Sequence, residues 1–90
     1  MEITDVRVHL RQGEDHLKAF VSVILDGAFA VEDLKVVDGA RGLFVSMPRR
    51  KLPAGPYRDV AHAVTKEMRE ALQTRVLAVY QQALEGTASG

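Results

Sequence analysis

The stretch that decides the fold is LKAFVSVILDGAFAVEDLKVVDG, residues 17–39. Every odd-numbered residue of 17–25 is apolar, which is the two-residue period of a β-strand with one face in a core. Asp26-Gly27 follows and favours a tight hairpin turn, because both residues tolerate a positive φ. A second strand is predicted over 29–37, with a bulge at Glu32-Asp33 where the alternation breaks. The stretch therefore predicts an antiparallel hairpin.

Further strands are predicted on both sides of this hairpin. Residues 3–11 are predicted to form a strand, because the even positions from Val6 to Leu10 are apolar and the odd positions from Asp5 to Arg11 are polar. A turn at 12–15 leads into the strand at 17–25. A fourth strand is predicted over 43–47, after turn residues between 38 and 42. Because short connections join antiparallel neighbours, these segments predict a four-stranded antiparallel meander.

The C-terminal part of the chain is predicted to be one amphipathic helix. Thr65 is a suitable N-cap, and Glu67 in the first turn suits the helix dipole. Gly86 is predicted to end the helix, leaving residues 86–90 as a flexible tail after a single domain at 1–85. The apolar stripe consists of Met68, Leu72, Val76, Val79, Tyr80 and Ala83. The predicted fold class is α+β: an antiparallel β-meander, then a basic loop, then a helix packed on the sheet.

The composition restricts the possible functions. The chain has 90 residues, no cysteine and a formal net charge of zero. Without cysteine, disulfides, thiolate metal sites and cysteine nucleophiles are excluded. No window resembles a membrane span or a signal peptide, so we expect no membrane partner. A secreted domain this small usually needs disulfides, so we expect a cytoplasmic protein. Any binding of nucleic acid must then come from a local basic patch.

Such a patch is predicted between residues 39 and 58, where cations occur without a single acid. Its prolines and glycines predict a loop without regular structure. Guanidinium and ammonium groups held on a loop suit the binding of phosphate oxygens. The alternative is a solvated loop whose charges only keep the protein in solution. The cations are Arg41, Arg49, Arg50, Lys51 and Arg58.

Two neighbouring features have alternative interpretations. Lys66, Arg69 and Gln73 lie at helical spacing and form either a second part of the patch or an ordinary solvated face, with Lys66 paired to Glu70. Tyr57 either stacks on an unpaired base or packs in the core.

No catalytic or metal site is expected. Asp59 and His62 are spaced as half of an acid–base or metal site, but the sequence indicates no third ligand. We interpret Asp59 as a cap of the helical region or as a partner of Arg58. We therefore expect no enzymatic activity, no cofactor and no small-molecule substrate.

Apolar residues on both faces of the second and fourth strands, at 17–25 and 43–47, do not fit a lone monomer, because one helix covers only one face. Leu77 and Leu84 also lie away from the centre of the helix stripe. We interpret these residues as the interface of a homodimer with twofold symmetry. The alternative is a core that wraps further around the helix.

Taken together, several blocks resemble the SpoVG family of bacterial septation and sporulation regulators. They follow one another in the family's order and spacing over roughly residues 1–80. Ala63 and Ser46 depart from the family pattern, in place of a proline and of a small apolar residue. The blocks are MEITDVRV, LKAFVSVILDGAFAV, LKVVDG, GLFVSMPRRK and YRDVAHAV.

The resemblance implies a homodimeric regulator of gene expression that binds DNA, with RNA as a further ligand. It places the contacts on the basic loop and at the start of the helix, and implies a role in septation and sporulation. The alternative function is a protein-interaction module that acts directly in septum formation. The residues implied to bind nucleic acid are Arg49, Arg50, Lys51, Arg58, Lys66 and Arg69.

Overall fold

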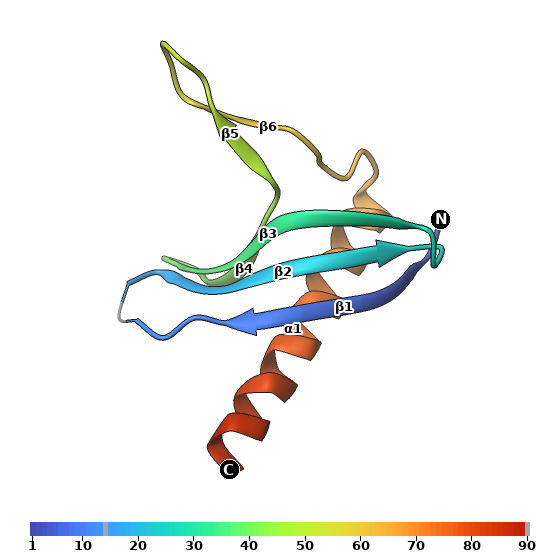
Figure 1. The fold of residues 1–90 in the computed structure, drawn as a ribbon, viewed down its shortest axis with the longest axis vertical. Coiled ribbons are helices and arrows are strands. Elements are labelled where there is room, and N and C mark those ends of the chain that lie inside the picture. Colours follow the sequence, from blue (N-terminus) through green and yellow to red (C-terminus); the bar gives the residue numbers. More distant parts are fainter. Residues whose placement is uncertain (14, 90) are drawn as a thin grey trace.

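The computed structural model describes residues 1–13 and 15–89 and has the predicted α+β fold (Figure 1). In the described residues, a sheet of four antiparallel strands in the order β1-β2-β3-β4 is followed by a small β5–β6 hairpin and one helix. The predicted meander is confirmed. Its strands are β1 (Ile3–Leu10), β2 (Leu17–Leu25), β3 (Phe29–Gly39) and β4 (Gly42–Ser46).

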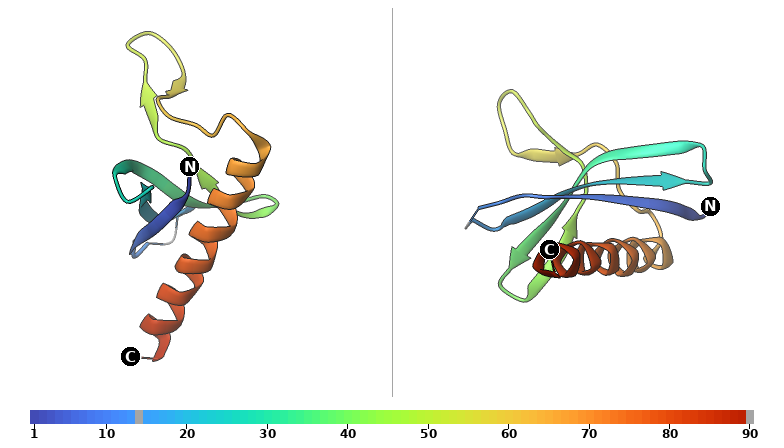
Figure 2. Two further views of the ribbon diagram at one scale, coloured as in Figure 1. Left: turned by 90° about the vertical axis from the view of Figure 1, so that its right-hand side faces the viewer. Right: turned by 60° about the horizontal axis from the view of Figure 1, so that its bottom comes forward.

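The helix α1 (Lys66–Ser89) lies across one face of the sheet and closes the core (Figure 2). The predicted stripe is confirmed, because Leu72, Val76 and Tyr80 are buried and the other members are partly buried. Arg75 fixes the helix to the first strand, with Nη1 donating a hydrogen bond of 3.0 Å to the carbonyl oxygen of Ile3. The largest fully buried side chains are Leu34, Val21, Val23, Val36 and Val76.

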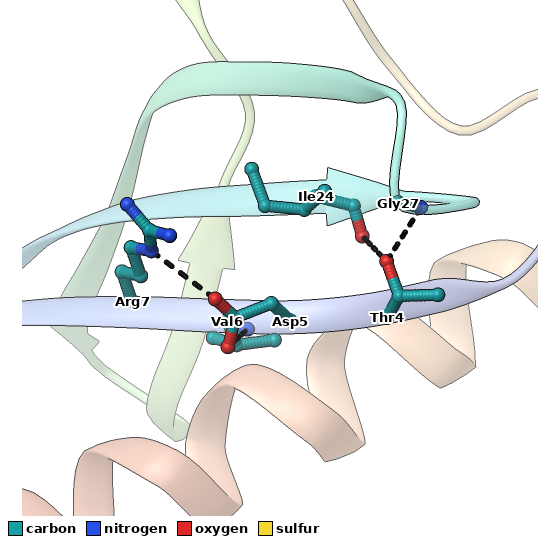
Figure 3. A network of polar contacts seen from close by, with 6 residues as sticks. All are labelled: Thr4, Asp5, Val6, Arg7, Ile24 and Gly27. Carbon is teal, nitrogen blue, oxygen red and sulfur yellow. Dashed lines mark hydrogen bonds and ion pairs between the residues drawn. The ribbon is translucent and has the colours of Figure 1, made fainter.

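The β2–β3 hairpin turn is held by the Thr4 side chain of β1 as well as by its own geometry. Asp26 and Gly27 have φ angles of 52° and 63°, as the Asp-Gly signal predicts. Thr4 Oγ1 accepts a hydrogen bond of 2.8 Å from the Gly27 N–H and donates one of 3.2 Å to the Ile24 carbonyl (Figure 3). The turn and the first strand therefore support each other.

The predicted bulge in β3 is confirmed. Asp33 has a φ of 65°, and the β2–β3 register shifts between Val21 and Val23. The extra residue changes which positions of β3 face the helix: Val31 packs against the core before the bulge, and Leu34 is buried after it.

Two boundaries differ from the prediction. Gly86 lies inside α1, which continues to Ser89, and Gly86 does not have the positive φ that ends a helix. The prediction that residues 39–58 hold no regular structure after the fourth strand is also wrong. Residues Arg49–Lys51 and Tyr57–Asp59 form strands β5 and β6, because the prolines flank these strands without interrupting them. Gly90 of the predicted flexible tail lies outside the described residues.

The second face of the sheet is not covered by α1. Phe20 and Phe44 project from it and are each 42% exposed, which confirms that β2 and β4 are apolar on both faces. Leu77, by contrast, packs against the core, while Leu84 is exposed. No helix in the described part of the chain is long and apolar enough to cross a membrane.

Gly42 and Gly55 form a matched pair for testing backbone strain. A Cβ at either position would meet nothing within 4 Å, but Gly42 has a φ of 111° whereas Gly55 has no positive φ. We expect Gly42→Ala to lower the free energy of unfolding by about 1–2 kcal/mol, because an L-residue is strained in that conformation. We expect Gly55→Ala to be neutral or to stabilise by up to about 1 kcal/mol. Urea unfolding of both variants measures the difference, and equal losses would contradict strain as the cause.

Candidate nucleic-acid interface

Strands β5 (Arg49–Lys51) and β6 (Tyr57–Asp59) form an antiparallel hairpin that projects from the body of the protein (Figures 1 and 2). We call residues 48–60 the basic arm. At its base, the Val60 N–H donates a hydrogen bond of 2.9 Å to the carbonyl oxygen of Pro48, which is buried. A proline cannot donate to a strand ladder, so Pro48 suits the position just before β5.

The register of the basic arm separates its cations onto two faces. Arg50 lies opposite Arg58, and the flanking pairs are Arg49 with Asp59 and Lys51 with Tyr57. Because successive side chains of a strand point to opposite faces, Arg50 and Arg58 share one face and the flanking pairs share the other. Like charges directly opposite each other destabilise a strand pair. An anion bound between Arg50 and Arg58 would relieve that repulsion.

Arg49 differs from these two arginines because it already has a partner. Its Nε donates a hydrogen bond of 2.9 Å to Asp59 Oδ1, and both side chains are partly exposed. The prediction that Asp59 caps the helical region or ties down Arg58 is therefore wrong. The stretch without acids that the sequence indicated ends at residue 58. The next residue is Asp59, and the pairing of β5 with β6 places its carboxylate beside Arg49.

A groove of about 390 Å³ lies where the base of the basic arm meets β4 and α1. It brings together two of the predicted cations, Arg49 and Arg69, which are far apart in sequence. Gln73, which also lines the groove, accepts a hydrogen bond of 3.3 Å at Oε1 from the Val45 N–H on the edge of the sheet. The remaining lining residues are Phe44, Val45, Ser46, Met47, Asp59, His62 and Ala63.

The start of α1 confirms the N-cap predicted at Thr65 and places Lys66 outside the groove. Thr65 caps the helix, because its Oγ1 accepts a hydrogen bond of 3.1 Å from the Met68 N–H. Lys66 Nζ lies 3.8 Å from Glu70 Oε1, the ion pair expected of a solvated helix face. Exposed pairs of this kind contribute little stability, and this one offsets the positive charge of Lys66.

The structure thus groups the six predicted residues in three places. Arg50 and Arg58 face outward together on the basic arm, and Lys51 lies on the arm's opposite face. Arg49 and Arg69 line the groove, and Lys66 lies apart on the helix.

Aromatic and titratable residues complete the site. Tyr57 is 61% exposed, so the interpretation that it packs in the core is wrong. His62, weighed in the sequence only with Asp59, lines the groove beside it. Among residues 1–13 and 15–89, no group of three or more histidine, aspartate or glutamate side chains is placed to hold a metal ion. The charged side chains of the described site are mainly arginine and lysine, which are groups suited to pairing with anions.

Comparison with known proteins confirms the family that the sequence resembles. The SpoVG family model matches residues 1–82. The chain is 52% identical over 84 residues to a protein of Heliobacterium modesticaldum, covering 93% of this chain and 94% of that protein. It is 46% identical over 89 residues to a protein of Thermoanaerobacter sp., covering 99% and 97%. Both relatives are named "Putative septation protein SpoVG". By this similarity over nearly its whole length, the chain belongs to the SpoVG family.

Proposed function

We propose that this protein is a cytoplasmic nucleic-acid-binding regulator of gene expression that binds DNA, and also RNA, through the basic arm. The observation that carries the proposal is the pairing of Arg50 with Arg58 on one face of a projecting hairpin. Arginine forks bind phosphate oxygens in bidentate geometry. Because the basic arm carries four cations and one acid in a chain of zero net charge, the rest of the chain is net negative, and only the arm attracts a polyanion.

The groove at the base of the arm adds to this surface. Arg69 lines this groove and lies on α1. A phosphate bound in the groove would contact the helix, whereas a phosphate bound by Arg50 and Arg58 would contact the β5–β6 hairpin. Contacts from two elements would set the register of the polymer on the protein, which phosphate contacts do without reading sequence.

We further propose that the protein acts as a homodimer. Phe20 and Phe44 lie on the sheet face that α1 does not cover, and apolar faces of this kind mark interaction surfaces. A twofold dimer would carry two basic arms, and so double the local positive charge of a chain whose net charge is zero.

The names of the relatives connect this binding to a process. They are described as septation proteins, and we propose that this chain controls genes of cell division and sporulation-type programmes. The second candidate function is a protein-interaction module that acts directly in septum formation. It is favoured by the same exposed Phe20 and Phe44, and by an apolar hollow of about 610 Å³ between α1 and the sheet.

A salt series separates the two functions. Four predicted cations have no ion pair among those identified in the described residues: Arg50, Lys51, Arg58 and Arg69. If each neutralises one phosphate, log K for duplex DNA should fall with log[salt] with a slope of about −4 per chain. Affinity would then drop by about 150- to 250-fold between 50 mM and 200 mM salt.

The measurement is fluorescence anisotropy of labelled DNA and RNA fragments across that range. Absence of binding at the lowest salt would overturn the proposal and leave the protein-interaction module, whose apolar contacts withstand salt.

A further inference from the structure

The tip of the basic arm is chemically unlike its sides. Residues 52–56 read Leu-Pro-Ala-Gly-Pro and contain no charged or hydrogen-bonding side chain. All five are exposed, and none belongs to the hydrophobic core. Apolar side chains at the end of a projecting hairpin contribute nothing to the packing of this chain. Cations, by contrast, flank the tip on both strands, at Lys51 and Arg58.

The tip is also held in one shape. The Leu52 N–H donates a hydrogen bond of 3.3 Å to the Pro56 carbonyl, and the Gly55 N–H donates one of 3.5 Å to the Leu52 carbonyl. Pro53 and Pro56 each have a fixed φ, which lowers the conformational entropy that the tip loses on binding. A preorganised apolar tip is therefore presented beyond two rows of cations.

We propose that the basic arm enters the minor groove of duplex DNA and that Leu52 and Pro53 wedge between neighbouring base pairs and kink the duplex. This inference rests on the proposed function and specifies its ligand. Cations on both faces of the arm match the phosphate rows that border a groove on both sides. Leucine and proline are among the side chains that act as wedges from the minor groove.

The dimensions of the arm fit this role. An extended chain rises about 3.4 Å per residue, so the segment from Pro48 to Ala54 reaches about 20 Å. The minor groove is only about 7.5 Å deep, so the tip reaches the base edges while Arg50 and Arg58 remain near the phosphates. Two adjacent strands are about 4.8 Å apart between their backbones, so the arm with its side chains is wider than the undistorted groove of about 6 Å. The arm therefore enters only as the kink opens the minor groove.

A wedge implies a preference for DNA sequences that kink easily, and this preference needs no hydrogen bond to a base. Unstacking costs least at pyrimidine–purine steps such as TA and CA, and stiff A-tracts resist it. The ligand class is therefore duplex DNA with a flexible central step. A single strand has no stacked duplex to kink, so its binding should not depend on Leu52.

The test compares bending with binding in the same sample. A duplex of about 30 base pairs, with fluorophores at both ends and a central TA step, is titrated with the whole protein at low salt. We expect energy transfer to rise on binding, corresponding to a kink of about 20–90°. Leu52→Ala should lose more than half of that rise and keep the salt slope of binding. Leu52→Phe should retain the rise.

Leu52→Ala preserves the backbone hydrogen bonds of the tip, so the variant remains folded. Val64→Ala is the matched control, because Val64 is an apolar residue outside the arm that is 89% exposed. It should bend DNA like the unmodified protein.

Binding without a rise in energy transfer, or an unchanged rise with Leu52→Ala, would overturn the wedge and leave the proposed function intact. A change in sedimentation of Leu52→Ala without DNA would show that the tip contacts protein, which also overturns it. Absence of binding to any DNA would overturn both proposals.

Discussion

Replacing Arg50 and Arg58 together by alanine is expected to weaken DNA binding at 100 mM salt by at least tenfold. The slope of log K against log[salt] should become less negative by about 2, because two phosphate contacts are lost. The two arginines are the cross-strand neighbours that share one face of the basic arm, and both are exposed. Fluorescence anisotropy with one duplex at four salt concentrations measures both quantities.

Loss of folding would not explain this result. Arg50 and Arg58 face each other as like charges, so their removal relieves repulsion in the hairpin and should leave the melting temperature unchanged or slightly raised. An unchanged slope with a lowered melting temperature would contradict the phosphate clamp and indicate a structural role.

Two further variants serve as controls for charge. Arg7→Ala with Arg11→Ala removes the same number of arginines far from the arm, where each is paired with an aspartate of its own segment. This control should change the salt slope by less than half a unit. Asp59→Asn should act in the opposite direction and tighten binding several-fold, because Arg49 loses its partner and the groove loses an acid.

Much of the fold followed from local sequence chemistry. The alternation of β1 and β2, the Asp26-Gly27 turn and the N-cap at Thr65 each depend on residues within a few positions, so a single sequence is sufficient to recognise them. The bulge at Asp33 was visible for the same reason, because it disrupts a period that is otherwise regular.

The sequence predicted which cations belong to the candidate site, but not the strands that carry them or the partner of each cation. Strands of three residues show no measurable period, and the prolines near them predicted a loop, so β5 and β6 were not predicted. The partner of each cation depends on the hairpin register, which places Asp59 against Arg49 across ten positions of sequence. Tyr57 is exposed because it lies on the β5–β6 hairpin, which projects beyond the core (Figure 1).

A small hydrophobic core supports the basic arm. Truncation of a side chain in that core is expected to have a large effect on the free energy of unfolding. Leu34→Ala is expected to lower the free energy of unfolding by about 3 kcal/mol, within the usual range of about 2–5 kcal/mol for buried leucine. Leu34 is only 1% exposed and lies directly after the bulge, opposite Val21. Because it also borders the apolar hollow of about 610 Å³, neighbouring side chains have room to relax, which favours the lower part of that range.

A domain of 90 residues has a total stability of roughly 5–13 kcal/mol, so this one substitution removes a large share of it. Urea unfolding should show a lower midpoint with an unchanged slope, because the same surface is exposed on unfolding. Val64→Ala is the control, since Val64 is 89% exposed and its truncation should change stability by less than about 0.5 kcal/mol. At temperatures where Leu34→Ala remains folded, its salt slope for DNA should match the unmodified protein, because the cations of the basic arm lie outside the core. A loss of less than 1 kcal/mol would contradict the assignment of Leu34 to a closed core between sheet and helix.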